Sequence, residues 1–114
     1  MKKRKDIPPN AQDIEEIVLG ALMIDNKAAD EVVQRLNVPG MFYEPKHQHI
    51  FNAIHSLYEK NEPIDISTVS HRLKAMGTFD MAGGDFYLIQ LTKKIASSAH
   101  IDHHSRILIQ ESGL

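Results

Sequence analysis

The chain of 114 residues has the length of one domain, and its 42% hydrophobic and 25% charged residues are the balance of a globular protein, which excludes a disordered chain. It contains no cysteine, which excludes a disulfide framework and a thiolate metal site. The first six residues carry a net charge of +3 and the rest −5, so the body is acidic and poorly suited to duplex DNA.

The first forty residues predict two helices. Asn10 and Asp13 resemble an N-cap and its N3 partner at the start of the first helix. Asp25 caps the second, and Pro39-Gly40 ends it. Each helix would bury one stripe of apolar side chains at helical spacing. The two stripes consist of Ile14, Ile17, Val18, Ala21 and Leu22, and of Ala29, Val32, Val33 and Leu36.

Two further helices are predicted in the middle of the chain. Pro45 suits the first position of a helix, and the NEP segment 61–63 ends that helix. Asp65 caps the next helix, and Gly77 stands at its C′ position. The buried faces would consist of Ile50, Phe51, Ile54, Leu57 and Tyr58, and of Ile66, Val69, Leu73 and Met76.

Gly83 and Gly84 precede a fifth predicted helix, which carries Phe86, Leu88, Ile89 and Leu91. A phosphate-binding loop would need a strand before the glycines and a Lys-Ser/Thr pair directly after them. Here no strand signal precedes the pair, and Asp85 would repel a phosphate. We therefore interpret the pair as a turn with positive φ, or as a close approach of backbone to the Tyr87 region.

Ser97 or Ser98 caps a sixth predicted helix. Its apolar residues spread over an arc of about 200°, whereas a helix that faces a single core shows a stripe nearer 100°. Either this helix packs on two sides, against its own domain and against a second chain or a following segment, or its last apolar residue is exposed near a frayed end. The arc consists of Ile101, Ile107, Leu108 and Ile109.

Strand signals are scarce, so the sequence predicts an all-α fold, a compact bundle of about six short helices. No apolar run approaches the roughly 20 residues of a membrane span. The start MKKRKDIPPN has no apolar stretch after its charges and is therefore not a signal peptide. We expect a cytoplasmic protein.

Histidines and carboxylates offer only weak candidates for metal binding or catalysis. His100 and His104 lie four residues apart, with His103 beside them, but no third or fourth ligand accompanies them, and solvated or half-buried histidines are the alternative. His47 falls on an apolar arc and could be a core histidine with one hydrogen-bonded nitrogen. The carboxylate pairs fall on polar faces, where solvation is the default; they are Glu15-Glu16 and Asp30-Glu31.

Residues 65–77 (DISTVSHRLKAMG) offer an alternative function, a small helix-turn-helix-like DNA-binding regulator. Arg72 and Lys74 are the only cations on this helix, which is few for phosphate contacts. The side chains considered for base or phosphate contacts are Ser67, Thr68, Ser70, His71 and Arg72.

Four stretches, in this order and at this spacing, resemble the N-terminal domain of the replicative hexameric DNA helicase of bacteria, the DnaB-like family. They are IPPNAQDIEEIVLGALMIDNKA, MFYEPKHQHIFNAI, PIDISTVSHRLKAMGTFDMAGGDFYLIQL and IASSAHIDHHSRIL, which together cover roughly residues 7–111. The most specific part is the ordered set E-x-x-V-L-G-x-L-M, P-I-D-x-x-T-V and G-G-x-x-Y-L. The chain departs from the family at His103-His104, where an aromatic residue is common, and at Asp85.

The resemblance implies an all-helical head followed by a helical hairpin, which form dimers in a collar on the hexamer. Primase and, in some bacteria, a helicase loader dock on that collar. ATP, Mg²⁺ and single-stranded DNA belong to the parent protein and its separate RecA-like domain, so we expect no catalysis, cofactor or metal in this chain. The implied core consists of Ile14, Val18, Leu22, Phe42, Ile50, Phe51, Ile54, Leu73, Tyr87 and Leu91.

The same resemblance divides the chain into three parts: a basic flexible tail at 1–9, a helical head at 10–97, and the first hairpin helix at 98–114. That helix would be truncated at the end of the chain, with the second arm of the hairpin absent. We expect the partner-facing edge on this last segment. Its predicted contact residues are Ile101, His104, Leu108 and Ile109.

Overall fold

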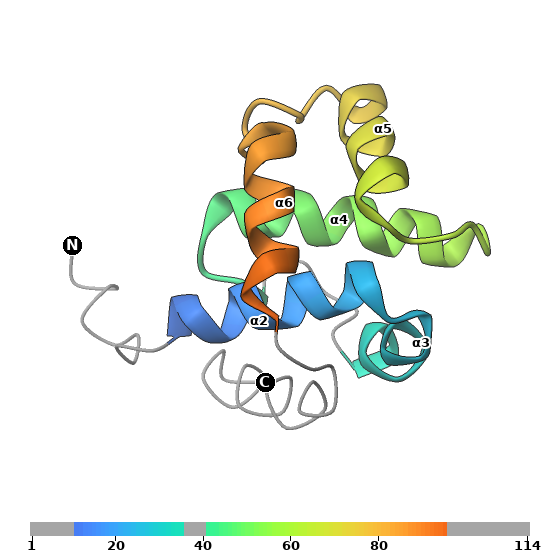
Figure 1. The fold of residues 1–114 in the computed structure, drawn as a ribbon. Helices are drawn as coiled ribbons and strands as arrows, with labels where there is room; N and C mark the ends of the chain where they lie inside the picture. The colour runs from blue at the N-terminus through green and yellow to red at the C-terminus, as the bar shows by residue number, and fades with distance from the viewer. Residues whose placement is uncertain (1–10, 36–40, 96–114) are drawn as a thin grey trace.

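The computed structural model describes residues 11–35 and 41–95, which form helices without any strand (Figure 1). This confirms the predicted all-α class. The predicted N-cap at Asn10, the stop at Pro39-Gly40 and the sixth helix lie outside the described residues. The helices are α2 (Ala11–Ile24), α3 (Asn26–Arg35), α4 (Pro45–Glu59), α5 (Ile66–Met76) and α6 (Gly84–Lys94).

Local signals define the helix ends. The carboxylate of Asp25 accepts a hydrogen bond from the second backbone N–H of α3 at 2.9 Å. Asp65 and Thr68 form a reciprocal capping box at the start of α5, with hydrogen bonds of 2.8 and 2.9 Å. Pro45 occupies the first turn of α4, and Gly77 ends α5 in the left-handed conformation, with φ 76°. These four predictions are confirmed.

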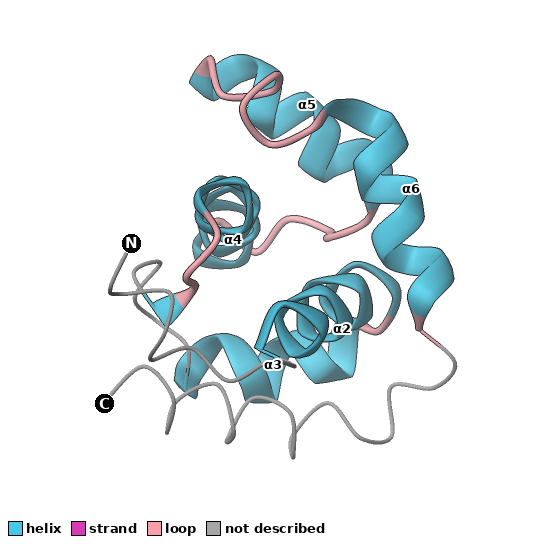
Figure 2. Cartoon of the chain, turned by 90° about the vertical axis from the view of Figure 1, so that its left-hand side faces the viewer, coloured by secondary structure: helices cyan, strands magenta, loops and turns pink. Residues whose placement is uncertain are grey.

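Helix α2 lies at the centre of the domain, and its most extensive partner is α6, which runs across it in Figure 1. The two backbones approach closely at Gly20, where a Cβ atom would overlap the carbonyl oxygen of Leu91. Glycine is therefore the residue that allows this crossing. Helix α4, which Figure 2 views end-on, packs on the same central helix and on α5, and also touches α3.

The core is aromatic at its centre, where the rings of Phe42 and Phe51 lie 5.1 Å apart. Nine of the ten predicted core residues are buried, and the tenth, Tyr87, is half-buried against the core. Met76 was predicted to lie inside, but 37% of it is exposed. It is the last residue of α5, and the turn at Gly77 leads the chain away there.

The glycine pair before α6 makes a turn, as predicted. Gly83 and Gly84 both have positive φ, at 100° and 71°. A Cβ atom on Gly83 would lie 2.8 Å from the Cβ atom of Tyr87, so both interpretations of the pair, the turn and the close approach, hold. Among the described residues, no helix is both long and apolar enough to cross a membrane.

Candidate functional site

Glu15 ties the central helix α2 to the start of α4. Its carboxylate accepts hydrogen bonds from the backbone N–H groups of Tyr43 and Glu44, at 2.6 and 3.4 Å. Glu44 is the N-cap residue of α4, and its own side chain makes no cap hydrogen bond. A carboxylate beside a helix N-terminus is favoured by the unpaired N–H groups and by the helix dipole. Glu15 therefore supplies, from another helix, a carboxylate that accepts hydrogen bonds at this N-terminus.

The sequence placed Glu15 on a solvated polar face, and that prediction is wrong. The side chain is 0% exposed. A buried carboxylate must have its lone pairs satisfied, and Glu15 meets this requirement through the start of α4 and through His47.

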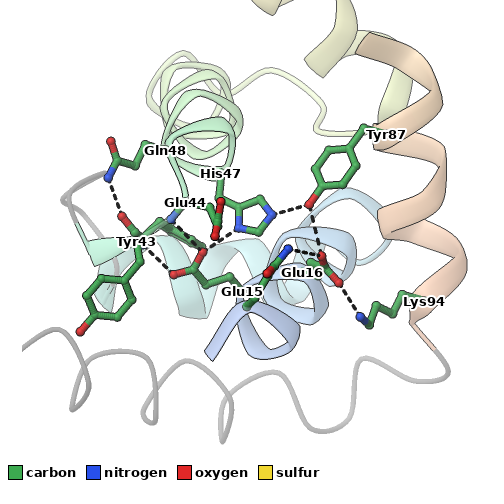
Figure 3. A network of polar contacts seen from close by, with 10 residues as sticks. Glu15, Glu16, Tyr43, Glu44, His47, Gln48, Tyr87 and Lys94 are labelled. Atoms are coloured by element: carbon green, nitrogen blue, oxygen red, sulfur yellow. Dashed lines mark hydrogen bonds and ion pairs between the residues drawn. The ribbon is translucent and has the colours of Figure 1, made fainter. Parts of the chain in front are cut away.

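His47 connects three helices through both of its ring nitrogens (Figure 3). Its Nδ1 atom lies 2.6 Å from Oε1 of Glu15 on α2, and its Nε2 atom lies 2.5 Å from the hydroxyl of Tyr87 on α6. The histidine is fully buried on α4. The prediction of a core histidine is therefore confirmed, but it has two hydrogen-bonded nitrogens rather than one.

The network reaches the surface through Glu16 and Lys94. The Tyr87 hydroxyl lies 3.4 Å from Oε2 of Glu16, whose other oxygen pairs with the ammonium group of Lys94. Lys94 also pairs with Asp13 at 2.8 Å. Lys46 places its ammonium group 4.0 Å from the centre of the Tyr87 ring. We call this connected set, from Glu15 through His47, Tyr87 and Glu16 to Lys94, the polar relay.

Two groups at the outer end of the relay have shifted pKa values. Burial raises the pKa of Tyr87, and the Glu16 carboxylate beside it adds to the effect, so the phenol keeps its proton at neutral pH. Hydrogen bonds to Asp13 and then to Glu16 raise the pKa of Lys94, so that side chain stays charged. A pocket of about 400 Å³ opens here, lined by Glu16, Tyr87, Gln90, Leu91, Lys93 and Lys94.

The relay contains groups that serve as acids and bases in enzymes, but its geometry favours a structural role. Both nitrogens of His47 are occupied, and the pocket beside the relay reaches Glu16 and Tyr87 without being lined by the histidine. A general base needs a free nitrogen within reach of a substrate. Within residues 11–35 and 41–95, no group of three or more metal-ligating side chains comes together.

Apolar side chains are exposed around α6 and the end of α2. Phe86 is 73% exposed, and Ile24 and Ile89 are also exposed. Ile24 and Ile66 line a groove of about 520 Å³ between α2, α5 and α6, and Ile66 and Ile89 line an adjoining groove of about 410 Å³ between α5 and α6. Exposed apolar residues of this kind suit contacts with other proteins.

The side chains considered for DNA contact on α5 largely make contacts within the domain. Thr68 belongs to the capping box, and Ser70 is buried. Arg72 lies 3.8 Å from Glu62. The DNA-binding alternative remains a prediction, and these contacts within the domain count against it.

The predicted partner-facing residues lie outside the described residues. They are Ile101, His104, Leu108 and Ile109, and the predicted histidine pair at 100 and 104 lies in the same segment. The described chain leaves α6 at Lys94 and Ile95, directly beside the outer end of the polar relay. The relay therefore lies at the point from which the segment 96–114 continues.

Comparisons with known proteins agree with this architecture. The family model described as the DnaB-like helicase N terminal domain matches residues 7–110. The replicative DNA helicase DnaB of Rhodothermus marinus is 38% identical over 105 residues, covering 92% of this chain and 11% of that protein. Its counterpart from Geobacillus stearothermophilus is 33% identical over 108 residues, covering 95% of this chain and 24% of that protein.

A solved structure matches the fold as well. The crystal structure of the N-terminal domain of DnaB helicase from Mycobacterium tuberculosis aligns with a TM-score of 0.82 and 33% identity, covering 87% of this chain and 71% of that one. The chain spans a quarter or less of the two curated relatives named above. A family model that covers nearly the whole chain, together with the same all-helical fold, assigns the family. This chain belongs to the DnaB-like helicase N-terminal domain family.

Proposed function

We propose that this chain is the scaffolding and partner-docking domain of a replicative hexameric DNA helicase. In this role it supports the association of subunits, as dimers within the hexamer, and presents a surface to primase and to a helicase loader during DNA replication. The domain performs no catalysis of its own. ATP, Mg²⁺, single-stranded DNA and the unwinding reaction belong to the rest of the parent protein, which works in the cytoplasm.

The observation that carries the proposal is the match of the whole domain to a family whose named relatives are replicative helicases. The chain spans 11% and 24% of two of those relatives, so most of each helicase lies outside the region that this domain matches. Support for a docking role comes from the exposed apolar residues Ile24, Phe86 and Ile89. We place the main partner contact on the segment after α6, at Ile101, His104, Leu108 and Ile109.

The proposal is tested by titrating the C-terminal domain of primase into the 114-residue chain in a calorimeter. We expect binding by the native chain and a loss of affinity of about tenfold or more for Ile109→Asp, because a carboxylate cannot be buried in an apolar contact without a partner. Gln110→Asp is the matched control, since it adds the same charge one position away without removing an apolar side chain, and it should bind nearly as the native chain does.

Equal affinities of the native chain and Ile109→Asp would remove that residue from the docking surface. Absence of binding by a folded native chain would contradict primase docking by these 114 residues. Self-association is tested separately, by light scattering of the eluting chain over a range of concentrations. A strictly monomeric chain would contradict subunit association through this part of the protein.

A further inference from the structure

The hydroxyl of Tyr87 has two polar neighbours within hydrogen-bond distance and only one proton to donate. Its oxygen lies 2.5 Å from Nε2 of His47 and 3.4 Å from Oε2 of Glu16. Because burial and the Glu16 carboxylate keep the phenol protonated, the hydroxyl remains a donor at neutral pH. It can satisfy the histidine or the glutamate, but not both at once.

The protonation of His47 decides which acceptor receives the proton. In the neutral form with hydrogen on Nδ1, that nitrogen donates to Glu15, and Nε2 accepts from Tyr87. The Tyr87 oxygen then faces Oε2 of Glu16 with no hydrogen between them. When Nε2 also carries a proton, it donates to the Tyr87 oxygen, and the hydroxyl is free to donate to Glu16.

We propose that the polar relay is a proton-operated switch, in which a proton taken up at Nε2 of His47 turns the Tyr87 hydroxyl from the histidine to Glu16. No covalent bond between heavy atoms forms or breaks. One proton enters from solvent, the hydroxyl rotates, and one hydrogen bond replaces another. Every donor and acceptor between Glu15 and Glu16 is satisfied in the protonated state.

Charged groups on each packed element set the balance between the two states. Besides burial, three carboxylates act on the Tyr87 phenol and raise its pKa; they come from α2 and from the residue before α4, and are Glu16, Glu44 and Glu15. The ammonium group of Lys46, on α4, lies over the Tyr87 ring and brings a positive charge to the same place. On α6, Lys94 neutralises part of the charge of Glu16 and is itself shared with Asp13.

The outer residue of the polar relay, Lys94, is the last residue of α6, directly before the segment that follows this helix. The Glu16 carboxylate lies within hydrogen-bond distance of the Tyr87 hydroxyl and pairs with the ammonium group of Lys94, in the last turn of α6. A proton in the core therefore changes the hydrogen bonding of the residue that anchors this last turn. Any influence on docking rests on the proposed function, whereas the relay itself does not, and the experiment below reads the relay alone.

The test is an NMR titration of the 114-residue chain with ¹⁵N-labelled histidine and ¹³C-labelled glutamate carboxyl groups. It covers the whole pH range in which the chain stays folded. We expect the ¹⁵N signal of Nε2 and the carboxyl signal of Glu16 to change with the same midpoint. In Tyr87→Phe, which removes only the hydroxyl, the Glu16 signal should no longer follow the histidine.

A second variant keeps the test decisive if Tyr87→Phe does not fold. Glu16→Ala leaves Nε2 as the remaining acceptor for the hydroxyl, so the midpoint of His47 should move to lower pH. Asp13→Ala is the matched control, because it removes a carboxylate that pairs with Lys94 without touching Tyr87, and it should move the midpoint much less.

Four results would overturn the switch. The Glu16 signal could stay constant while His47 titrates, or the histidine nitrogens could keep one protonation state across the range. The response of Glu16 could persist in folded Tyr87→Phe, which would mean that the coupling runs through space and not through the hydroxyl. Glu16→Ala could leave the midpoint unchanged.

Discussion

Removal of the Glu15 carboxylate is the perturbation from which the structure predicts the largest effect at a polar position. Glu15→Ala deletes the acceptor of two hydrogen bonds of 2.6 Å, one from the backbone N–H of Tyr43 and one at Nδ1 of His47. The buried His47 ring and the partly buried N–H of Tyr43 then lose this acceptor. It also removes the anion beside the N-terminus of α4.

The magnitude follows from the hydrogen bonds that are lost. Each buried donor that loses its acceptor costs about 1–3 kcal/mol, and breaking a buried pair by removing one partner costs about 3–5 kcal/mol. Because these costs overlap, we expect Glu15→Ala to lower the free energy of unfolding by about 3–5 kcal/mol. Glu15→Gln keeps an acceptor oxygen and the shape of the side chain, so it should cost clearly less than the alanine.

The assay is urea unfolding followed by far-ultraviolet circular dichroism, in which a lower midpoint at unchanged slope reports a loss of stability. Glu31→Ala is the matched control, because it makes the same chemical change at an exposed position of α3, and it should stay within about 0.5 kcal/mol of the native chain. A Glu15→Ala chain that unfolds at the same midpoint as Glu31→Ala would refute the anchoring role derived for the carboxylate.

Three further substitutions test the packing and the caps. Phe51→Ala should lower stability by about 3–5 kcal/mol, because the ring is fully buried, and a thermal melt that barely moves would count against its place in the core. Gly20→Ala should lower stability by about 1–3 kcal/mol, because the added methyl group pushes α2 away from the carbonyl oxygen of Leu91. Alanine favours a helix over glycine, so a variant that melts at a higher temperature would show that α2 and α6 do not meet so closely. Asp65→Ala should cost about 1 kcal/mol and speed the amide exchange of Thr68, and unchanged exchange would argue against the capping box.

The helix ends were predictable because their causes are local. Asp65 and Thr68 are three residues apart and bond to each other, and Asp25 caps residues two and three positions ahead. Pro45 and Gly77 act through their own backbone preferences. A pattern confined to a few residues can be recognised in the sequence, whatever the rest of the chain does.

The polar relay was not predictable in the same way. Glu15 and His47 are 32 residues apart, and His47 and Tyr87 are 40 apart, so no local pattern joins them. A weaker signal was present. Glu15 is followed at i+3, i+4 and i+7 by buried apolar residues, and His47 is followed by apolar residues at the same spacing. Two polar residues that each begin a buried stripe are candidates for pairing with one another; the stripes are Val18, Leu19 and Leu22, and Ile50, Phe51 and Ile54.

The sequence also did not indicate which apolar residues of α6 would be exposed. Leu88 and Leu91 of α6 are buried, while Phe86 and Ile89 on the same helix face outward. Periodicity identifies residues that could be buried, but the positions of neighbouring helices decide which of them are covered. The segment expected to carry the partner contacts lies outside the described residues.

The central claim is that this domain serves a replicative helicase, and the coding sequence downstream of Leu114 tests it most directly. We predict a second hairpin helix, a linker and then a G-x-x-x-x-G-K-[ST] loop between a strand and a helix, which is the signature of an ATP-binding domain. A stop codon directly after Leu114 would contradict the helicase function, even though the family fold would stand.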